Sequence, residues 1–164
     1  MTGDRTKATT EGAASAMLDA VAGWPAEKMA SLMVESTPYS VALGFRYVSS
    51  SPGFGSIMLP WRADLVGLDG TDILASGAVT ALIDHTCGLA IMAYFGTRAA
   101  PATLDLRVDH MRPAAAGASV IASAHCYKVT RSIAFLRAEA WDVSRDDPVA
   151  TAQAAFTLNR RETR

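Results

Sequence analysis

Apolar positions along this chain follow a helical period near the N-terminus and a strand period further on. Residues 13–21 and 26–34 carry apolar side chains at helical spacing, and Pro25 stands between the two segments. The pattern predicts one or two short helices that end near Pro38. Residues 39–44 then form a connector or a single helical turn.

From Phe45 onward the apolar period changes to two, which is typical of strands. Residues 45–50 and 55–61 predict a hairpin that turns at Pro52 and Gly53. Four longer strands are predicted in the second half of the chain, at residues 103–111, 119–130, 132–143 and 149–159.

In two of these strands apolar residues occupy every second position, so each strand has one apolar face. Leu104, Leu106 and Val108 alternate with charged residues, which predicts a half-buried strand. In the last strand small apolar residues occupy alternate positions, and our interpretation is that this face meets a second subunit. These residues are Ala150, Ala152 and Ala154.

One segment between the two groups of strands, residues 74–94, is apolar on nearly every face. A helix of this kind belongs in a core or in a membrane. Asp84 and His85 nevertheless lie near its middle, and a carboxylate there is costly unless it is paired or open to a cleft. Small residues share the face of Asp84 at helical spacing, which leaves room for a second backbone or for a ligand. They are Gly77, Ala81 and Gly88.

The order of these elements predicts an α+β fold, with one long buried helix wrapped by an antiparallel sheet of about six strands. The length of 164 residues fits one domain with a sizeable core. The formal net charge of −1 and the lack of basic runs argue against a nucleic-acid partner. The sequence shows neither a signal peptide nor an uninterrupted apolar run of about 20 residues, so we expect a cytoplasmic protein with no membrane partner.

Cysteines and histidines give no sign of a metal site. Cys87 and Cys126 lack the spacing of a zinc site or of a disulfide scaffold. His110 and His125 lie on predicted strands without a partner residue nearby in sequence. We therefore expect no metal and no other cofactor.

Five short strings of sequence carry a likeness to a known family. GAVTALIDHTCG is similar to the helix string GGVxxxLxDxxxG, and TLDLRVDHMRP is similar to a strand that begins T-x-D and ends R-P. LGF precedes the first strand, and RSIAF and VATA begin two late strands. Together they resemble the hotdog-fold acyl-CoA thioesterases of the PaaI-like (phenylacetate-pathway) type. The strings occupy residues 43–45, 77–88, 103–113, 131–135 and 149–152.

The resemblance implies a hotdog thioesterase domain at residues 39–160, preceded by a tail and helical extension at residues 1–38. It implies hydrolysis of an acyl-CoA thioester by a homodimer or a dimer of dimers. Asp84 would act as general base or nucleophile, and the amides of Ser76 and Gly77 would form the oxyanion hole. Eight residues of helix span about 12 Å, too far for one carbonyl to touch both the acid and the amides within a subunit. The resemblance implies that two antiparallel copies of this helix pack in the dimer, so that the acid of one subunit faces the amides of the other.

By the same resemblance, Thr103 holds the attacking water or the carboxylate. The chain departs from the family at Ala75, where these thioesterases commonly have a histidine. Four further residues are expected to bind the substrate, and the two arginines among them would lie near the phosphates of CoA. They are Asp69, His85, Arg112 and Arg131.

Each candidate also has a purely structural explanation. Asp84 could be a buried acid that is satisfied by Thr80 or by a backbone group, and His85 could be structural because no orienting partner is evident. Ser76 could be only a helix N-cap. Thr103 could be an ordinary strand residue. Both arginines could be solvated surface residues.

Three functions remain open at this level. The first is an acyl-CoA thioesterase for a medium, aromatic or bulky acyl group, lined by Ile83 and Met92. The second is a hotdog hydratase or dehydratase that uses His85 with an acid. The third is a dimer that binds acyl-CoA or a protein without catalysis. A fold alone does not choose among them.

Overall fold

The computed structural model describes residues 26–95 and 99–160, so the expected helix at residues 13–21 lies outside the described part. The helices are α2 (Ala26–Ser36), α3 (Pro38–Leu43), the 3-10 turn η1 (Ala63–Leu65) and α4 (Ser76–Phe95). The strands are β1 (Arg46–Ser51), β2 (Phe54–Leu59), β3 (Ala99–His110), β4 (Val120–Val129), β5 (Ile133–Trp141) and β6 (Ala150–Arg160).

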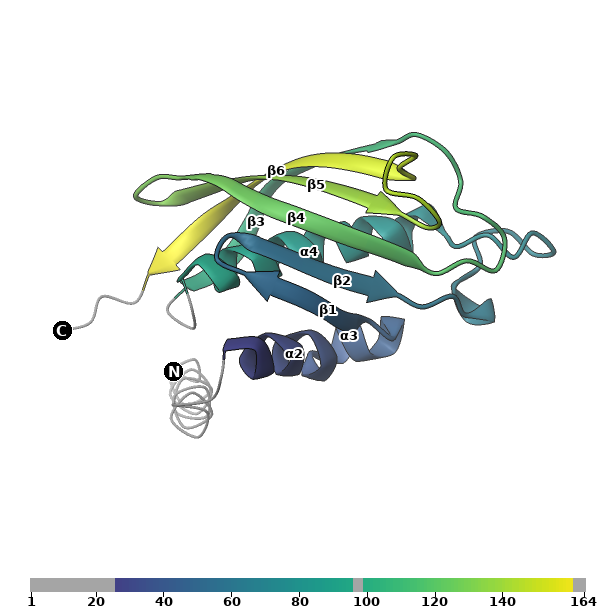
Figure 1. Cartoon of the computed structure of the whole chain (residues 1–164), viewed down its shortest axis with the longest axis horizontal. Coiled ribbons are helices and arrows are strands. Elements are labelled where there is room, and N and C mark those ends of the chain that lie inside the picture. Colours follow the sequence, from purple (N-terminus) through teal and green to yellow (C-terminus); the bar gives the residue numbers. More distant parts are fainter. Residues whose placement is uncertain (1–25, 96–98, 161–164) are drawn as a thin grey trace, which may run out of the picture.

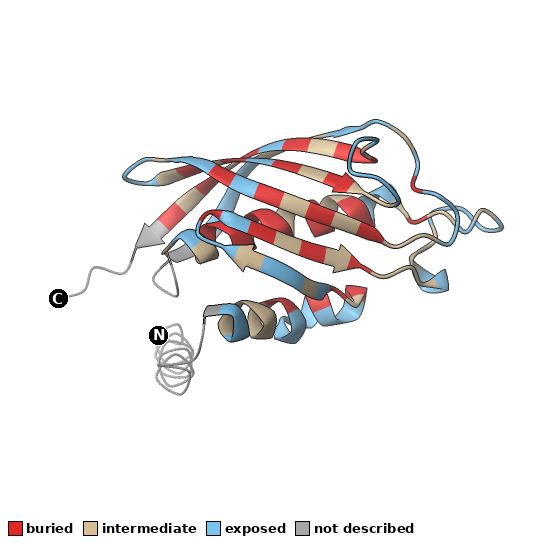
Figure 2. Ribbon diagram, viewed as in Figure 1, coloured by how far each residue is buried: buried red, intermediate tan, exposed pale blue. Residues whose placement is uncertain are grey.

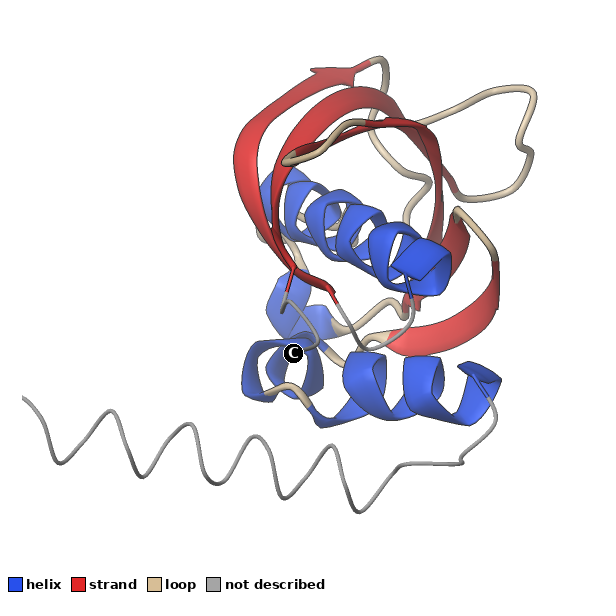
Figure 3. Ribbon diagram, turned by 90° about the vertical axis from the view of Figure 1, so that its left-hand side faces the viewer, coloured by secondary structure: helices blue, strands red, loops and turns tan. Residues whose placement is uncertain are grey.

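The strands form one antiparallel sheet in the order β1-β2-β4-β5-β6-β3. The sheet curls around α4, and α2 and α3 lie on the side of α4 away from the sheet (Figures 1 and 3). β3 follows α4 in sequence but pairs with the last strand, β6, and forms an outer edge. The predicted α+β fold, with a long helix inside a sheet of six strands, is confirmed.

Burial alternates along β2, β4, β5 and β6 (Figure 2), and their buried side chains belong to the same core as those of α4. The inner faces of β4, β5 and β6 are rich in alanine, because a curved sheet approaches its helix closely only where the side chains are small. Gly55 of β2 shows how close this approach is, since a Cβ there would lie 2.9 Å from Cγ of Leu89. The buried alanines include Ala122, Ala124, Ala134, Ala138 and Ala140.

The small residues of β6 belong to this inner face. Ala150, Ala152 and Ala154 are buried in the core of the same chain. The interpretation that they meet a second subunit is therefore wrong. Their alternation marks the face that covers α4, and the sequence could not show which of the two faces that is.

Most of α4 is buried, with Leu82, Ile83 and Ile91 fully enclosed. Ile83 therefore belongs to the core and not to an acyl-binding surface. Among the described residues, α4 is the one helix that is long and apolar enough to cross a bilayer, and half of its most apolar window is buried within this fold. Its apolar character is explained by its place inside the sheet.

The helices α2 and α3 cover part of the side of α4 that the sheet leaves bare. Pro38 begins α3, where a missing amide proton costs nothing, and Gly44 ends it with a left-handed φ of 73°. Val34 of α2 is buried against the core. The division into an extension up to residue 38 and a domain at residues 39–160 stays a prediction.

Candidate active site

Asp84 lies in the middle of α4, half-buried beside the edge strand β3. The hydroxyl of Thr103 on β3 donates a hydrogen bond of 2.8 Å to Oδ1 of Asp84. Thr80, the alternative partner considered from the sequence, instead donates to the carbonyl of Ser76 at 3.0 Å. Within the described residues Asp84 accepts no second hydrogen bond, so its other oxygen can accept one from water or a ligand.

A bulge in β3 directs Thr103 towards α4. The pairing of β3 with β6 shifts register between Thr103 and Asp105, and Leu104 is the extra residue. Thr103 consequently pairs with Phe156 and shares its helix-facing side of the sheet. Regular alternation, on which the sequence prediction of this strand rests, would instead place Thr103 with Asp105 on the outer face.

The face of α4 that carries Asp84 is open along its length. A side chain added at Gly77 or at Gly88 would meet no described heavy atom within 4 Å of its Cβ. Ala81 and Asp84, between these glycines, are both half-buried. We call these four residues the open stripe. It has the small side chains and the accessibility that the sequence predicts for a surface that a second backbone or a ligand approaches.

The entrance of α4 has free backbone donors. The carbonyl of Ala75 accepts from the amides of Ala78 at 3.0 Å and Val79 at 3.3 Å, so Ala75 is the N-cap residue. Ser76 is therefore the first residue of the helix, and the alternative that it is the N-cap is wrong. Ala75 has no side chain that could bond to the first amides. In the described part of the chain nothing accepts from the amides of Ser76 or Gly77.

A short loop holds this entrance in place. Val66 pairs with Leu74, and the amide of Ala75 donates to the carbonyl of Leu65 at 2.9 Å. A Cβ at Gly67 would lie 3.0 Å from Cα of Ala75, so only glycine fits this approach without a shift. Asp69 lies at the exposed end of the loop and makes no contact with Asp84 among the described residues.

His85 is turned away from Asp84 and towards α3. Its Nε2 lies 3.0 Å from the hydroxyl of Ser40, which is buried, and its ring packs beside Phe45 at 5.7 Å. Burial lowers the pKa of His85, although the carboxylate of Asp84 opposes the shift. These contacts supply the orienting partner that the sequence did not reveal, and they favour the structural explanation of His85.

Arg112 is engaged in an ion-pair cluster. Its guanidinium donates to both oxygens of Asp142, at 2.9 and 2.6 Å, and to the carbonyl of Asp147 at 2.6 Å. The side chain of Asp142 is 1% exposed and also accepts from the amides of Ala115 and Val143. The Arg112 guanidinium, with these amides, holds the pKa of Asp142 well below its usual range. Arg112 therefore connects the end of β3 to the turn between β5 and β6.

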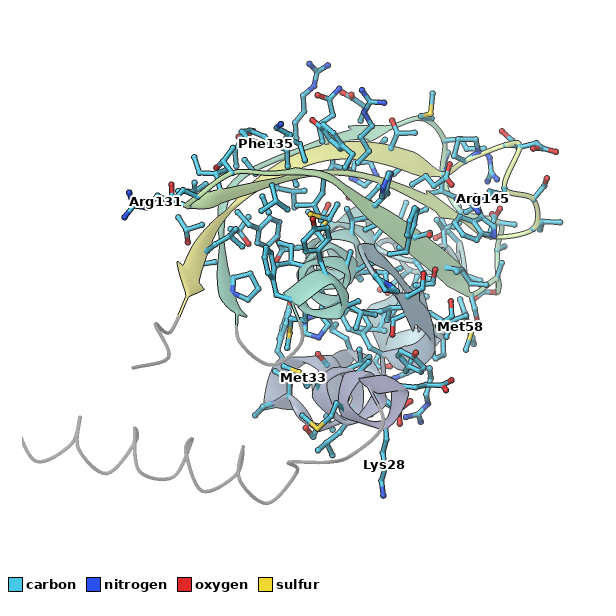
Figure 4. The ribbon with its side chains drawn as sticks, turned by 60° about the vertical axis from the view of Figure 1, so that its left-hand side comes forward. Lys28, Met33, Met58, Arg131, Phe135 and Arg145 are labelled. Atoms are coloured by element: carbon cyan, nitrogen blue, oxygen red, sulfur yellow. The ribbon has the colours of Figure 1, made fainter. Side chains whose placement is uncertain are left out.

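Arg131 lies in the turn before β5, exposed and without an ion pair among the described residues. Figure 4 shows Arg131 at one end of the sheet and Arg145, in the turn after β5, at the other. Asp142, the partner of Arg112, also follows β5. The length of β5 therefore separates Arg112 from Arg131 within one chain, so the two arginines lie at opposite ends of the sheet.

The two cysteines are buried core residues. Cys87 and Cys126 are buried and unpaired with each other. Burial raises the pKa of Cys87 to about 12, with Asp84 and Cys126 adding to the shift, so the thiol stays protonated at neutral pH. Among residues 26–95 and 99–160, no group of three His, Cys, Asp or Glu is placed to hold a metal ion.

A hollow of about 360 Å³ lies on the outer face of the sheet, away from Asp84. Its charged groups already have partners. Arg145 pairs with Glu139, and Arg137 lies over the ring of Tyr127 at 4.9 Å. We therefore place the candidate site at α4 and β3.

The structure also brings together two residues that sequence reasoning left apart. The hydroxyl of Thr80 lies 3.3 Å from Nε2 of His110, at the end of β3. Thr80 is one helical turn from both Ser76 and Asp84, so this contact lies between the helix entrance and the acid. The sequence contains one sign of this contact. Leu106, Val108 and His110 occupy alternate positions of the strand, so they share the helix-facing side of the sheet.

The curled antiparallel sheet around one buried helix, with an acid on an open helical face, defines a hotdog-fold protein. Residues 72–149 match the family model described as the thioesterase superfamily. This match, together with the PaaI proteins among the similar solved structures, confirms the resemblance drawn from the sequence. No curated protein matches the chain in sequence.

Solved structures support the same placement. A protein from Pseudomonas aeruginosa is 28% identical, with 81% of this chain and 98% of that one covered and a TM-score of 0.74. A mutant of the phenylacetic acid degradation protein PaaI from Thermus thermophilus is 29% identical over 74% of this chain and 98% of that one, with a TM-score of 0.63. PaaI of Escherichia coli, at 21% identity over 81% and 92% and a TM-score of 0.70, shares the fold.

Proposed function

We propose that this protein hydrolyses an acyl-CoA thioester to a free acid and CoA, with Asp84 as its general base or nucleophile. The observation that carries the proposal is the Asp84–Thr103 pair, which presents an oriented carboxylate with a free oxygen on an open face of α4. The match of residues 72–149 to the thioesterase superfamily model supports the reaction class.

The chemistry follows from what surrounds the acid. Asp84, as a base, takes a proton from water while the water oxygen attacks the thioester carbonyl. Negative charge then develops on the carbonyl oxygen, and backbone donors aimed at such an oxyanion commonly contribute about 3–4 kcal/mol each. The unpaired amides of Ser76 and Gly77, at the positive end of α4, supply these donors.

The acid and the amides come from two copies of the chain. Asp84 follows Ser76 by about 12 Å along the helix, so one thioester carbonyl cannot reach both within a single chain. β3 is twelve residues long and, among the described strands, pairs on one side only, with β6; the open stripe runs beside it. Edge strands of this length are ready to pair with another chain. An antiparallel second copy would bring its Asp84 to the entrance of this α4.

The substrate assignments differ in their support. Arg131 is free to meet the phosphates of CoA, whereas Arg112 already binds Asp142. Met92 is half-buried near the end of α4 and is a candidate to contact the acyl group. Asp69 would assist only in a dimer that brings its loop to the Asp84 of the other copy. We propose a medium, aromatic or bulky acyl group, in a dimer or a dimer of dimers.

A panel of acyl-CoAs tests the proposal, with release of free CoA followed by a thiol reagent. Wild-type protein should release CoA, and Asp84→Asn should not. Release unchanged in Asp84→Asn would remove Asp84 from the mechanism. No release from any acyl-CoA, with binding retained, would favour the non-catalytic alternative. The hydratase alternative predicts loss of enoyl-CoA absorbance, and the engagement of His85 with Ser40 argues against it.

A single turnover in ¹⁸O-water separates the two roles of Asp84. A base delivers the labelled oxygen straight to the released acid. A nucleophile forms an acyl-aspartate anhydride first, and attack of water on its aspartyl carbon puts the label into Asp84 and leaves unlabelled oxygen in the acid. General-base catalysis never labels Asp84, so label in Asp84 identifies it as the nucleophile.

A further inference from the structure

We infer that His110 is a second catalytic residue of the thioesterase site, the acid that protonates the departing CoA sulfur. This inference rests on the proposed hydrolysis of a thioester. It is carried by three observations: the face of β3 on which His110 lies, the direction of its hydrogen bond to Thr80, and the lack, among the described residues, of other side chains with this chemistry at the entrance of α4.

The register of the sheet places His110 beside α4. His110 pairs with Ala150, whose side chain is buried against the helix, so both lie on the inner face. His110 itself remains exposed, because β3 is the edge strand and α4 is open there. It is thus both on the helix-facing side and accessible to a substrate.

The hydrogen bonds around Thr80 define which nitrogen of His110 is free. The hydroxyl of Thr80 has one proton, and it donates this proton to the carbonyl of Ser76 at 3.0 Å. At the 3.3 Å contact, Nε2 of His110 must therefore donate and Thr80 must accept. Nδ1 has no partner among the described residues and stays available for exchange of a proton with a ligand.

Few other groups near the entrance can do this chemistry. Ala75 and Gly77 have no polar side chain, and Ser76 is exposed at the first turn. On β3, Asp109 and Arg107 pair with each other at 3.2 Å on the outer face. From Thr103 to the end of β3, His110 is the one titratable residue on the helix-facing side.

The step balances with the groups already named. Asp84 of a second copy removes one proton from water as the water oxygen bonds to the carbonyl carbon, and the C=O electron pair moves to oxygen. When the pair returns, the C–S bond breaks and its electrons stay on sulfur. Sulfur takes the proton on Nδ1 of His110, which leaves a neutral imidazole. Transfer of the proton from Asp84 to His110 through water restores both residues, and the net reaction consumes one water.

Leaving-group dependence tests this role. The acyl-CoA with the highest turnover is compared with the S-phenyl thioester of the same acid, because an aryl thiolate departs readily without a proton. His110→Gln should slow hydrolysis of the acyl-CoA by about 100-fold or more and that of the S-phenyl ester by less than about threefold. Thr80→Val, which removes the acceptor for Nε2, should reproduce a smaller part of the same selective loss. His125→Gln, on the outer face, is the matched control and should change neither rate.

The possible outcomes separate the inference from the proposed function. Equal losses on both thioesters, or no loss on either, would overturn the role of His110 while hydrolysis itself stands. Asp84→Asn should slow both thioesters alike, because it acts on the attacking water. A wild-type protein that hydrolyses neither thioester would overturn the proposed function, and the role of His110 with it.

Discussion

Asp84 and Asp142 each accept hydrogen bonds from a residue in β3 or just after it, but the two carboxylates differ in burial and in the number of hydrogen bonds that they accept. The side chain of Asp142 is 1% exposed and accepts two hydrogen bonds from Arg112 and two from backbone amides. Asp84 is half-buried and accepts one hydrogen bond, from Thr103. The carboxylate of Asp142 therefore has its hydrogen-bond acceptors occupied, whereas that of Asp84 can accept further hydrogen bonds beside an open face of α4.

This difference separates a structural acid from a candidate for chemistry. A buried carboxylate that is bidentate with arginine stabilises the ionised form and fixes three segments of chain together. A carboxylate oriented by a single hydroxyl keeps lone pairs for water or substrate. Arg112, expected to bind CoA, has donors engaged by Asp142 and Asp147 in a single chain, and its role towards CoA stays a prediction. Four measurements test this contrast.

The largest effect is expected on activity from Asp84→Asn. Loss of a general base should lower kcat by about 10²- to 10⁴-fold, because the amide cannot take the proton from water. The thermal midpoint should change little, since the carbonyl oxygen of the introduced amide still accepts from Thr103. The measurement is kcat for the best acyl-CoA together with a thermal scan. A large drop in Tm with kcat per folded molecule retained would assign Asp84 to the structural class of Asp142.

The opposite pattern is expected for Asp142→Ala. It leaves Arg112 without its main partner and strips the two amides of their acceptor, so the free energy of unfolding should fall by about 3 kcal/mol. Hydrolysis per folded molecule should stay near that of wild type. Urea denaturation measures the free energy of unfolding, and release of CoA per folded molecule measures hydrolysis.

Asp147 gives the matched control, because it contacts the same arginine from an exposed position. Asp147→Ala should cost about 0.5 kcal/mol or less, as exposed ion pairs usually do. Equal costs for the two variants would mean that the buried position of Asp142 contributes nothing.

A smaller effect is expected from Thr103→Val, which keeps the shape of the side chain and removes the donor to Asp84. A hydrogen bond that orients a carboxylate is worth about 1–2 kcal/mol, so kcat should fall by roughly 5- to 30-fold. Thr157→Val on β6, whose hydroxyl donates only to a backbone carbonyl, should leave kcat unchanged. If Thr103→Val matches that control, the acid does not depend on its hydroxyl partner.

The fold was predictable because its signals are local. The buried helix and the strands appear in the sequence as periods of 3.6 and 2, and the order of elements then defines an α+β arrangement. The side of the sheet to which each strand residue points is harder to predict. The bulge at Leu104 reverses the side on which Thr103 lies, and no pattern in β3 announces it.

The partners of the site residues were the hardest to foresee. Arg112 and Asp142 are 30 residues apart in sequence, as are Thr80 and His110, and each pair meets only after β3 has docked on β6 and α4. The buried partner of His85, Ser40, lies 45 residues away. Contacts of this kind depend on the tertiary register, which hydrophobic periodicity does not encode.

The smallest effect concerns His85, whose carboxylate neighbour Asp84 opposes the shift that burial causes. Burial lowers the pKa of His85 in the folded chain, whereas the unfolded chain protonates this residue near the ordinary histidine pKa of about 6.5. Between these two values the unfolded state binds more protons, so the stability that neutral His85 contributes is lost as pH falls below about 6.5.

Asp142 acts in a separate pH window, because its lowered pKa means that its contribution is lost only as pH falls below the ordinary carboxyl range. Urea denaturation between pH 7.5 and 5.5 should therefore show a decline in the stability of the wild type that His85→Gln reduces and Asp142→Ala leaves intact. If the stability of His85→Gln declines with pH as much as that of the wild type, the Ser40–His85 contact is not the cause of the decline.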